Sequence, residues 1–153
     1  MTIEIEPIGT INGGRAEPID DQWDQVRYEI VLDAAQFTPD AVSGLDAFSH
    51  LEVLYQFNQV GKDEITTAAR HPRGRTDWPK VGIFAQRGKN RPNRLGISVC
   101  KLVAVEGLVL TVEGLDAIQG SPILDIKPVM KGFLPRGTVT QPSWADEIMA
   151  DYW

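Results

Sequence analysis

The sequence has too few metal-ligating and nucleophilic side chains for several common kinds of site. It contains one cysteine, Cys100, and two histidines, His50 and His71. A single cysteine excludes a disulfide within the chain, and Cys100 lies in an apolar stretch typical of a buried strand in a protein of a reducing compartment. Two histidines and one cysteine make a zinc cage implausible, so we expect no metal.

Long hydrophobic runs and phosphate-binding loops are also missing. No stretch approaches the roughly 18 apolar residues of a membrane-spanning helix, and the first residues lack the basic start and apolar run of a signal peptide. We therefore expect a cytoplasmic protein without a membrane partner. No GxGxxG follows a strand and no GxxxxGK[ST] occurs, so a nucleotide-like cofactor must be bound in another way.

Alternation of apolar and polar residues dominates what is present. It runs with a period of two through residues 3–6, 26–33, 51–58 and 108–113, and shorter apolar runs occupy 81–85, 97–105 and 123–126. Period two with β-branched and aromatic residues predicts strands buried on one face. The chain of 153 residues is long enough for one domain with a sizeable core, and we expect a single domain over residues 1–153.

Helix is expected in two short segments only. Thr38 can cap a turn over residues 39–44, and Ser143 with Asp146 resembles a capping box that opens a helix from Trp144 to about Asp151. The fold class predicted is therefore mainly β, a small closed barrel of mostly antiparallel strands with short helices, one at the C-terminus. The apolar residues at the C-terminus favour docking on a second copy of the chain over folding back on the barrel.

Charge is unevenly distributed along the chain. The net charge is −6, yet residues 70–101 hold nine of the fifteen basic residues and one of the 21 acidic residues. Such a segment in an acidic protein suggests a local anion site, with a solvated basic loop as the alternative.

The segment 82–96 is rich in Gly, Pro, Asn and Arg and lies between two apolar stretches. This composition predicts a long ordered loop at one end of the barrel, where functional sites commonly lie. Arg87, Arg91 and Arg94 can each present a guanidinium fork to a carboxylate or phosphate.

Two carboxylates and one histidine are further candidates for chemistry. Asp116 is suited to accept hydrogen bonds from hydroxyls or an ammonium group. Asp125 lies in an apolar stretch, where an unpaired carboxylate is costly, so an ion pair with a neighbour such as Lys127 and a catalytic role both stay open. His50 is either a base or a hydrogen-bonded wall residue.

Three blocks of sequence follow one another in the order and spacing of a known family. Residues 47–59 contain FSHL and FNQ, residues 81–102 contain GIFAQRG and RPNRLGIS, and residues 115–128 contain LD and GSPILDIKP. They resemble the "FSHLW…FH", "GVFATRS…RPNPIGLS" and "LD…DGTPVLDIKP" blocks of the TsaA-like family. Its characterised members, called TrmO or YaeB, are S-adenosylmethionine (SAM)-dependent tRNA methyltransferases.

The resemblance implies a small barrel that binds SAM near the interface of a homodimer. It also implies methylation of the N6 nitrogen of threonylcarbamoyl-adenosine beside a tRNA anticodon. By alignment, the positions near SAM are Asn58, Gln59, Arg87, Ile97, Gly114, Leu115 and Asp116.

Within this family, we expect Arg87 to hold the methionine carboxylate of SAM and Asp116 to hold its ribose or ammonium group. The acceptor nitrogen is attached to a carbonyl and is a poor nucleophile, so a base should help, and His50 and Asp125 are the candidates. Contacts to tRNA phosphates are expected from the basic segment, namely from Arg73, Arg75, Lys89, Arg91 and Arg94.

The chain departs from the family pattern between Arg70 and Lys80, where the family usually has RPPRLGG, and at three single positions. Asn58 replaces a histidine, Gln86 replaces a threonine, and Arg94 replaces the second proline of RPNP. These departures bear on substrate identity more than on the cofactor. Two other functions are therefore kept as alternatives: a SAM-binding regulatory protein without catalysis, and a nucleic-acid-binding barrel that uses its basic loop alone.

Overall fold

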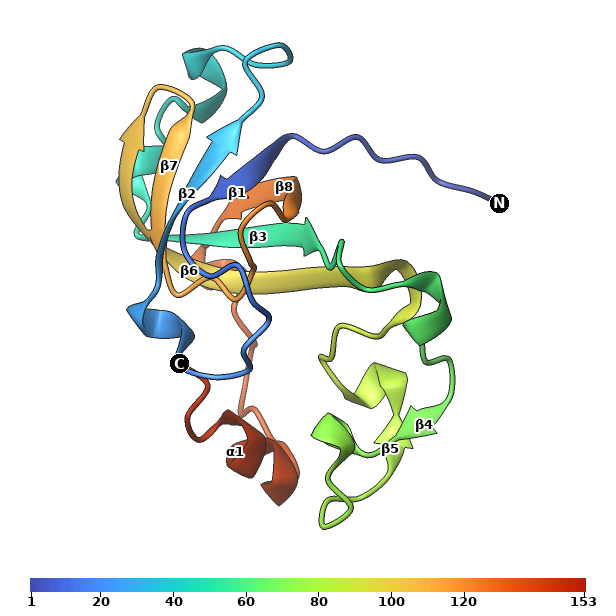
Figure 1. Cartoon of the computed structure of the whole chain (residues 1–153). Helices are drawn as coiled ribbons and strands as arrows, with labels where there is room; N and C mark the ends of the chain where they lie inside the picture. The colour runs from blue at the N-terminus through green and yellow to red at the C-terminus, as the bar shows by residue number, and fades with distance from the viewer.

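A closed six-stranded barrel forms the body of the protein in the computed structural model, which describes residues 1–153 (Figure 1). Its strands follow the order β1-β2-β7-β6-β3-β8, and every neighbouring pair is antiparallel. They are β1 (Gly9–Asn12), β2 (Arg27–Leu32), β3 (His50–Gln56), β6 (Leu95–Glu106), β7 (Val109–Glu113) and β8 (Pro122–Pro128). The prediction of a mainly β, closed antiparallel barrel is confirmed.

The apolar residues of the period-two pattern fill the interior of the barrel. On β3, Leu51, Val53 and Tyr55 are buried, while the residues between them are more exposed. Closure of the sheet leaves no free edge, so each inward side chain meets others from across the barrel. The core consists of Ile11, Trp23, Tyr28, Ile30, Leu32, Leu51, Val53, Tyr55, Cys100, Leu110, Val112, Leu115, Ala117 and Ile123.

The predicted strand over residues 3–6 is wrong. Its apolar side chains, Ile3 and Ile5, are 73% and 56% exposed, and the first strand begins only at Gly9. Gly9 pairs with Leu32, which is the last residue of β2. Backbone hydrogen bonding continues only to Ile8, which donates to the Ile123 carbonyl and accepts from the Asp33 N–H, so residues 3–6 have no neighbouring strand despite their alternation.

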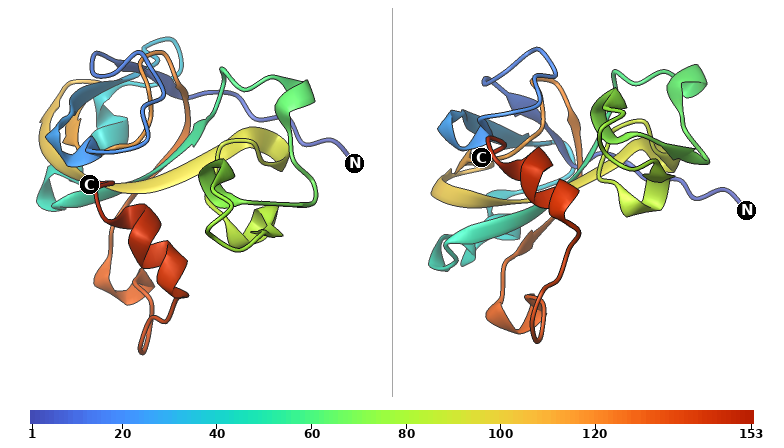
Figure 2. Two further views of the ribbon diagram at one scale, coloured as in Figure 1. Left: turned by 60° about the horizontal axis from the view of Figure 1, so that its bottom comes forward. Right: turned by 90° about the horizontal axis from the view of Figure 1, so that it is seen from below.

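The predicted barrel strand over residues 81–85 is also wrong. Only Val81–Gly82 (β5) is extended, and it pairs with Ala69–Arg70 (β4) in a separate two-stranded sheet. This sheet belongs to residues 57–94, which we call the β3–β6 lobe and which lies beside the barrel (Figure 2). The lobe also holds the 3₁₀ turns Lys62–Glu64, Pro72–Gly74, Ile83–Ala85 and Pro92–Arg94.

Helical structure outside the lobe is short, as expected. The turn predicted at 39–44 is present as a 3₁₀ helix over Pro39–Val42, and the C-terminal helix α1 spans Ser143–Met149. Other 3₁₀ turns cover Trp23–Gln25, Leu45–Ala47 and Lys131–Phe133. None of the helices has the length and hydrophobicity that a membrane crossing requires.

The capping box predicted for the C-terminal helix does not form. Pro142 is the N-cap residue, and no side chain caps the helix. The carboxylate of Asp146 instead accepts a hydrogen bond from Nε2 of Gln141 at 2.5 Å. The helix therefore starts one residue earlier than predicted, and Ser143 lies inside it.

The C-terminus folds back on its own barrel, contrary to the expectation that it docks on a second copy. Tyr152 packs against the barrel core. The backbone N–H groups of Gln22 and Trp23 donate hydrogen bonds of 2.9 Å to the carbonyls of Asp151 and Tyr152. Backbone N–H groups in the β1–β2 connection thus bind the C-terminus. The pattern of hydrophobic residues gives no sign of these hydrogen bonds.

Candidate functional site

One carboxylate ties together four segments of the chain. Oδ1 of Asp116 accepts hydrogen bonds from the Tyr55 hydroxyl, at 2.9 Å, and from the Ser98 hydroxyl. Oδ2 accepts a hydrogen bond from the Tyr152 hydroxyl. We call these four residues, from β3, β6, the segment after β7 and the C-terminus, the Asp116 cluster.

The corner that carries Asp116 depends on a glycine. Gly114 has a φ of +74°, and a Cβ at this position would lie 2.6 Å from Oδ1 of Asp24. Only glycine satisfies both conditions without a shift of its neighbours. Leu115 follows with its side chain fully buried in the core. The corner is thereby anchored on one side, and it presents Asp116 to the two strand hydroxyls.

The hydroxyls of the Asp116 cluster remain protonated donors. Burial raises the pKa of both Tyr55 and Tyr152 well above the usual tyrosine value, and the negative charge of Asp116 raises it further. Burial also raises the pKa of the neighbouring Tyr28 to about 12, and its hydroxyl is buried with no hydrogen-bond partner. The site thus contains one carboxylate among neutral phenols.

Arg87 lies beside the Asp116 cluster. Its Nη2 donates a 2.5 Å hydrogen bond to the carbonyl of Ile97, which precedes Ser98 on β6. The positive charge of Arg87 opposes the effect of Asp116 on the pKa of Tyr152, so both charged groups act on the same phenol. One guanidinium hydrogen bond leaves further donors free for an anion. Arg87, Ile97 and the corner at 114–116 are therefore brought together, as predicted for residues of one site.

Asn58 and Gln59 form an exposed turn directly after β3. Arg94 holds this turn, because its carbonyl accepts a hydrogen bond from the Phe57 N–H at 2.8 Å and its Nη1 donates to the Val60 carbonyl at 2.7 Å. No hydrogen bond joins the Asn58–Gln59 turn to Arg87 or Asp116. The turn lies at the end of the β3–β6 pair that also carries Tyr55, a few residues beyond that tyrosine.

The family model of the tRNA-methyltransferase O (TrmO) N-terminal domain matches residues 15–133, which is more than half of the chain. The chain belongs to this family. The matched range contains the β3–β6 lobe and the Asp116 corner, while α1 and Tyr152 follow it.

Individual proteins and a solved structure are also similar to this chain. The chain is 35% identical over 132 residues to a Methanothermobacter thermautotrophicus protein named "Probable S-adenosyl-L-methionine-binding protein", covering 84% of this chain and 90% of that one. It is 34% identical over 102 residues to the human tRNA (adenine(37)-N6)-methyltransferase, covering 67% of this chain and 23% of the relative. The crystal structure of TrmO from Pseudomonas aeruginosa aligns with a TM-score of 0.73 at 27% identity, over 92% of this chain and 61% of that one.

The share of a relative's length that this chain covers differs widely among the similar proteins. It spans 21–23% of the length of the mammalian methyltransferases. It spans most of the archaeal relative.

Two departures from the TrmO pattern have structural consequences in the lobe. Gln86 is 8% exposed, and its Nε2 donates to the carbonyls of Arg70 (3.0 Å) and Val81 (2.9 Å), across the β4–β5 pair. Arg94 has a φ of +54°, which the ring of a proline forbids. The third departure, Asn58, is exposed and makes no side-chain hydrogen bond.

Four of the five side chains predicted to contact RNA have partners within the chain. Arg73 pairs with Asp21 at 2.8 Å, and Arg75 pairs with Asp77 and lies 4.0 Å over the Trp78 ring. Arg91 donates to the Gln86 carbonyl at 2.8 Å, and Arg94 is bound to Val60 as described. Only Lys89 has neither a hydrogen bond nor an ion pair. Much of the basic segment is therefore engaged in hydrogen bonds and ion pairs within the chain.

The two predicted catalytic residues lie on the outer face of the barrel, away from the Asp116 cluster. His50 is exposed, contacts the Ser49 hydroxyl through Nδ1 at 2.7 Å, and precedes Tyr55 by five residues, roughly 16 Å along the strand. Asp125 forms an ion pair of 2.9 Å with Lys127, which raises the pKa of Lys127. The ion pair considered for Asp125 is therefore present.

Sequence reasoning missed three members of the Asp116 cluster. Ser98 offered a signal, because it is a polar residue at an inward position of an apolar strand. Tyr55 was expected inside the barrel but not as a hydrogen-bond donor, and nothing in the sequence connected Tyr152 with Asp116. No group of three or more His, Cys, Asp or Glu side chains is arranged to hold a metal ion.

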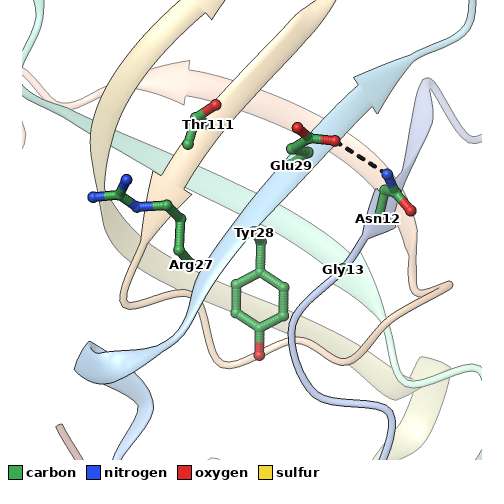
Figure 3. A pocket seen from close by; sticks show the side chains of 6 residues that line it. All are labelled: Asn12, Gly13, Arg27, Tyr28, Glu29 and Thr111. Carbon is green, nitrogen blue, oxygen red and sulfur yellow. Dashed lines mark hydrogen bonds between the residues drawn. The ribbon is translucent and has the colours of Figure 1, made fainter.

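A surface hollow lies elsewhere on the barrel and contains none of the predicted site residues. It has a volume of about 290 Å³ and is lined by Asn12, Gly13, Arg27, Tyr28, Glu29 and Thr111. Figure 3 shows the side chain of Asn12 reaching Glu29 across β1 and β2, a hydrogen bond of 3.1 Å. This open polar hollow is a feature of the outer surface of the barrel.

Proposed function

We propose that this protein is a SAM-dependent methyltransferase of adenosine 37 in tRNA, and that its acceptor is the N6 nitrogen of threonylcarbamoyl-adenosine beside the anticodon. The observation that carries the proposal is the Asp116 carboxylate, bound by Tyr152 and two strand hydroxyls, with the Arg87 guanidinium held at the carbonyl of Ile97 next to Ser98, in a member of the TrmO family. The names of the human and archaeal relatives support a tRNA adenine acceptor and a SAM cofactor, respectively. A tRNA substrate implies the cytoplasm as the place of action.

The side chains fit the functional groups of SAM. Its carboxylate suits the free donors of the Arg87 guanidinium, and its ammonium group and ribose hydroxyls suit the carboxylate of Asp116. The exposed amides of Asn58 and Gln59 offer both donors and acceptors. Ile97, Gly114 and Leu115 complete the proposed site, and Leu115 contributes through its backbone because its side chain is buried in the core.

SAM supplies a methyl group on a sulfonium, which is transferred by in-line displacement and so depends on alignment and exclusion of water. In this chain, Arg87 and Asp116 orient the cofactor, and the buried Tyr55 phenol keeps water from the Asp116 carboxylate. The proton of the acceptor nitrogen must leave to a base. His50 and Asp125 stay our candidates for that base, and their position on the outer face requires the acceptor to approach from outside β3 and β8.

Exposed apolar residues support a homodimer. Leu95, Ile97 and Val99 point outward from β6, next to a hollow of about 220 Å³ that includes Met130 and the 88% exposed Phe133. We propose that this face binds a second copy, which brings Ile97 and the cofactor site near the interface. Monomeric sedimentation at micromolar concentration would contradict the dimer without affecting the SAM site.

Residues 1–153 are proposed to act as one domain. The helix α1 follows the family match, yet it joins the lobe to the barrel. Its Glu147 accepts a 2.6 Å hydrogen bond from Nε1 of Trp78, and Tyr152 reaches Asp116.

Calorimetric titration with SAM tests the cofactor site. We expect saturable binding that Arg87→Ala weakens tenfold or more, the size typical of losing one charged hydrogen-bond partner. Lys89→Ala is the matched control, because it removes a charge from the same loop at a residue without a partner, and its affinity for SAM should be unchanged. Equal affinities of wild type and Arg87→Ala would contradict the site.

Transfer of a labelled methyl group from SAM to tRNA then separates the three functions. Labelling of tRNA by the wild type supports the enzyme. A lower labelling rate in His50→Ala or in Asp125→Asn identifies that residue as the base. SAM binding without any labelled acceptor favours the regulatory protein. RNA binding without SAM binding favours the nucleic-acid-binding barrel, whose affinity should fall steeply with salt.

A further inference from the structure

The two oxygens of Asp116 have different kinds of partners. Oδ1 is bound by Tyr55 and Ser98, which both belong to barrel strands and are buried. Oδ2 is bound by Tyr152, which belongs to the C-terminal segment. One oxygen is therefore part of the rigid barrel, while the other depends on how the C-terminus is placed.

The C-terminal segment, residues 143–153, is held by hydrogen bonds and by the packing of one side chain, Tyr152, against the barrel core. Its helix α1 has no buried residue. Besides the Tyr152 hydroxyl, its hydrogen bonds to the barrel and the lobe are the Glu147–Trp78 hydrogen bond and the two backbone hydrogen bonds from Gln22 and Trp23. Figure 2 shows α1 outside the barrel and outside the lobe. Segments with few buried apolar contacts open at a lower free energy than the core does.

Tyr152 lies where the proposed cofactor should bind. Arg87 and Asp116, the two charged residues assigned to SAM, both act on its phenol. The phenol is a single hydrogen-bond donor, as is each hydroxyl of a ribose. A carboxylate oxygen has about two acceptor positions, and Oδ1 already uses two, so the Tyr152 hydroxyl takes one of the few acceptor positions left for donors of the cofactor.

We propose that Tyr152 is an autoinhibitory latch: its hydroxyl occupies Oδ2 of Asp116 in the closed protein, and SAM binds only when this hydrogen bond opens and residues 143–153 move away. The inference rests on the proposed function, because it takes SAM as the ligand. The closed state lowers the apparent affinity for SAM in proportion to the fraction of molecules that are open.

The first test compares SAM affinities by calorimetry in wild type and Tyr152→Phe. The variant keeps the aromatic ring and loses only the latch donor, so its affinity should rise roughly tenfold, the effect of one hydrogen bond to a charged group. Tyr55→Phe is the matched control, because it removes a phenol hydroxyl from the same carboxylate but from a barrel strand. Its affinity should not rise. Unchanged or weaker binding by Tyr152→Phe, or equal tightening by Tyr55→Phe, would overturn the latch.

Amide hydrogen exchange of residues 143–153 provides a second readout. Without SAM, exchange in this segment should be faster in Tyr152→Phe than in wild type, and adding SAM to wild type should accelerate it. Protection of the segment by SAM would overturn the latch, since the segment would then close over the cofactor. If neither wild type nor Tyr152→Phe binds SAM, the proposed function itself fails and the latch with it, whereas equal binding by both proteins refutes the latch alone.

Discussion

The barrel and the β3–β6 lobe are stabilised in different ways. The barrel buries a contiguous cluster of fourteen residues, almost all apolar, most of them from alternate positions of its strands. The lobe buries only Val60, Trp78 and Ile83 among its large apolar residues, and none of these belongs to the barrel cluster. Its path is instead defined by side chains that donate to backbone carbonyls, namely Gln86, Asn90, Arg91 and Arg94.

Backbone conformation separates the two regions as well. Of the four residues other than glycine with positive φ, three lie in the lobe: Arg73, Asn93 and Arg94. Such conformations persist only where surrounding contacts hold them. The barrel therefore tolerates exchange of one apolar residue for another of similar size, whereas the lobe depends on individual polar side chains.

The largest effect is expected from a cavity in the barrel. Leu51 is fully buried, so Leu51→Ala should lower the free energy of unfolding by about 2–5 kcal/mol. Because the closed sheet unfolds as a unit, the loss should appear at one common midpoint in urea, followed by circular dichroism and by tryptophan fluorescence. Two separated transitions would contradict a barrel that unfolds cooperatively.

A smaller and local effect is expected in the lobe. Gln86→Leu leaves the carbonyls of Arg70 and Val81 without their donor, a cost of about 1–3 kcal/mol. Hydrogen exchange should accelerate in residues 66–94 and stay unchanged in β2 and β7. Lys89→Ala lies in the same region, but Lys89 has no hydrogen-bond or ion-pair partner. This variant should leave hydrogen exchange unchanged in both the lobe and the barrel strands. An equal acceleration in the barrel strands would show that the two regions are not independent.

The smallest effect concerns a surface ion pair of the barrel. Arg27 hydrogen-bonds Glu113 across β2 and β7 and holds the pKa of Glu113 below its usual value. A carboxyl whose pKa is lower in the folded state stabilises the fold above its unfolded-state pKa, and this contribution disappears as the pH falls through the folded-state value. The difference in melting temperature between wild type and Arg27→Gln should therefore be small at pH 7 and vanish in acid.

The corresponding pair of the lobe provides the control for that measurement. Arg75 and Asp77 lie two residues apart, and each shifts the pKa of the other in the stabilising direction. Since both side chains are exposed and local, Arg75→Gln should leave the barrel transition unchanged at every pH. A larger effect of Arg75→Gln than of Arg27→Gln would contradict this separation of the two regions.

Prediction from the sequence succeeded where burial follows a local pattern. The strands β2, β3, β6, β7 and β8 coincide with alternating or apolar runs, because inward and outward positions of a strand differ by one residue. The pattern failed at residues 3–6 and 81–85, where the residues alternate or are apolar but no barrel strand lies beside them. Alternation indicates a chain suited to a sheet, and the neighbouring strand decides whether it joins one.

The candidate site was predictable only in part. The family blocks pointed to Arg87, Ile97 and Asp116, which the fold brings together, and their roles in the cofactor site stay predictions. His50 and Asp125 are separated from the Asp116 cluster because their side chains face outward, a property that motif spacing does not report.

The sequence by itself determined the closed β-barrel and the family, because both depend on short-range patterns of apolar residues and on blocks of consecutive residues. Only the tertiary structure decided which partner each charged or polar group received. Arg73 meets Asp21, which is 52 residues away, and Tyr152 meets Asp116 across 36 residues. Hydrogen bonds of this kind join side chains that are brought together only after the strands have paired. The residues next to each partner in the sequence therefore do not predict them.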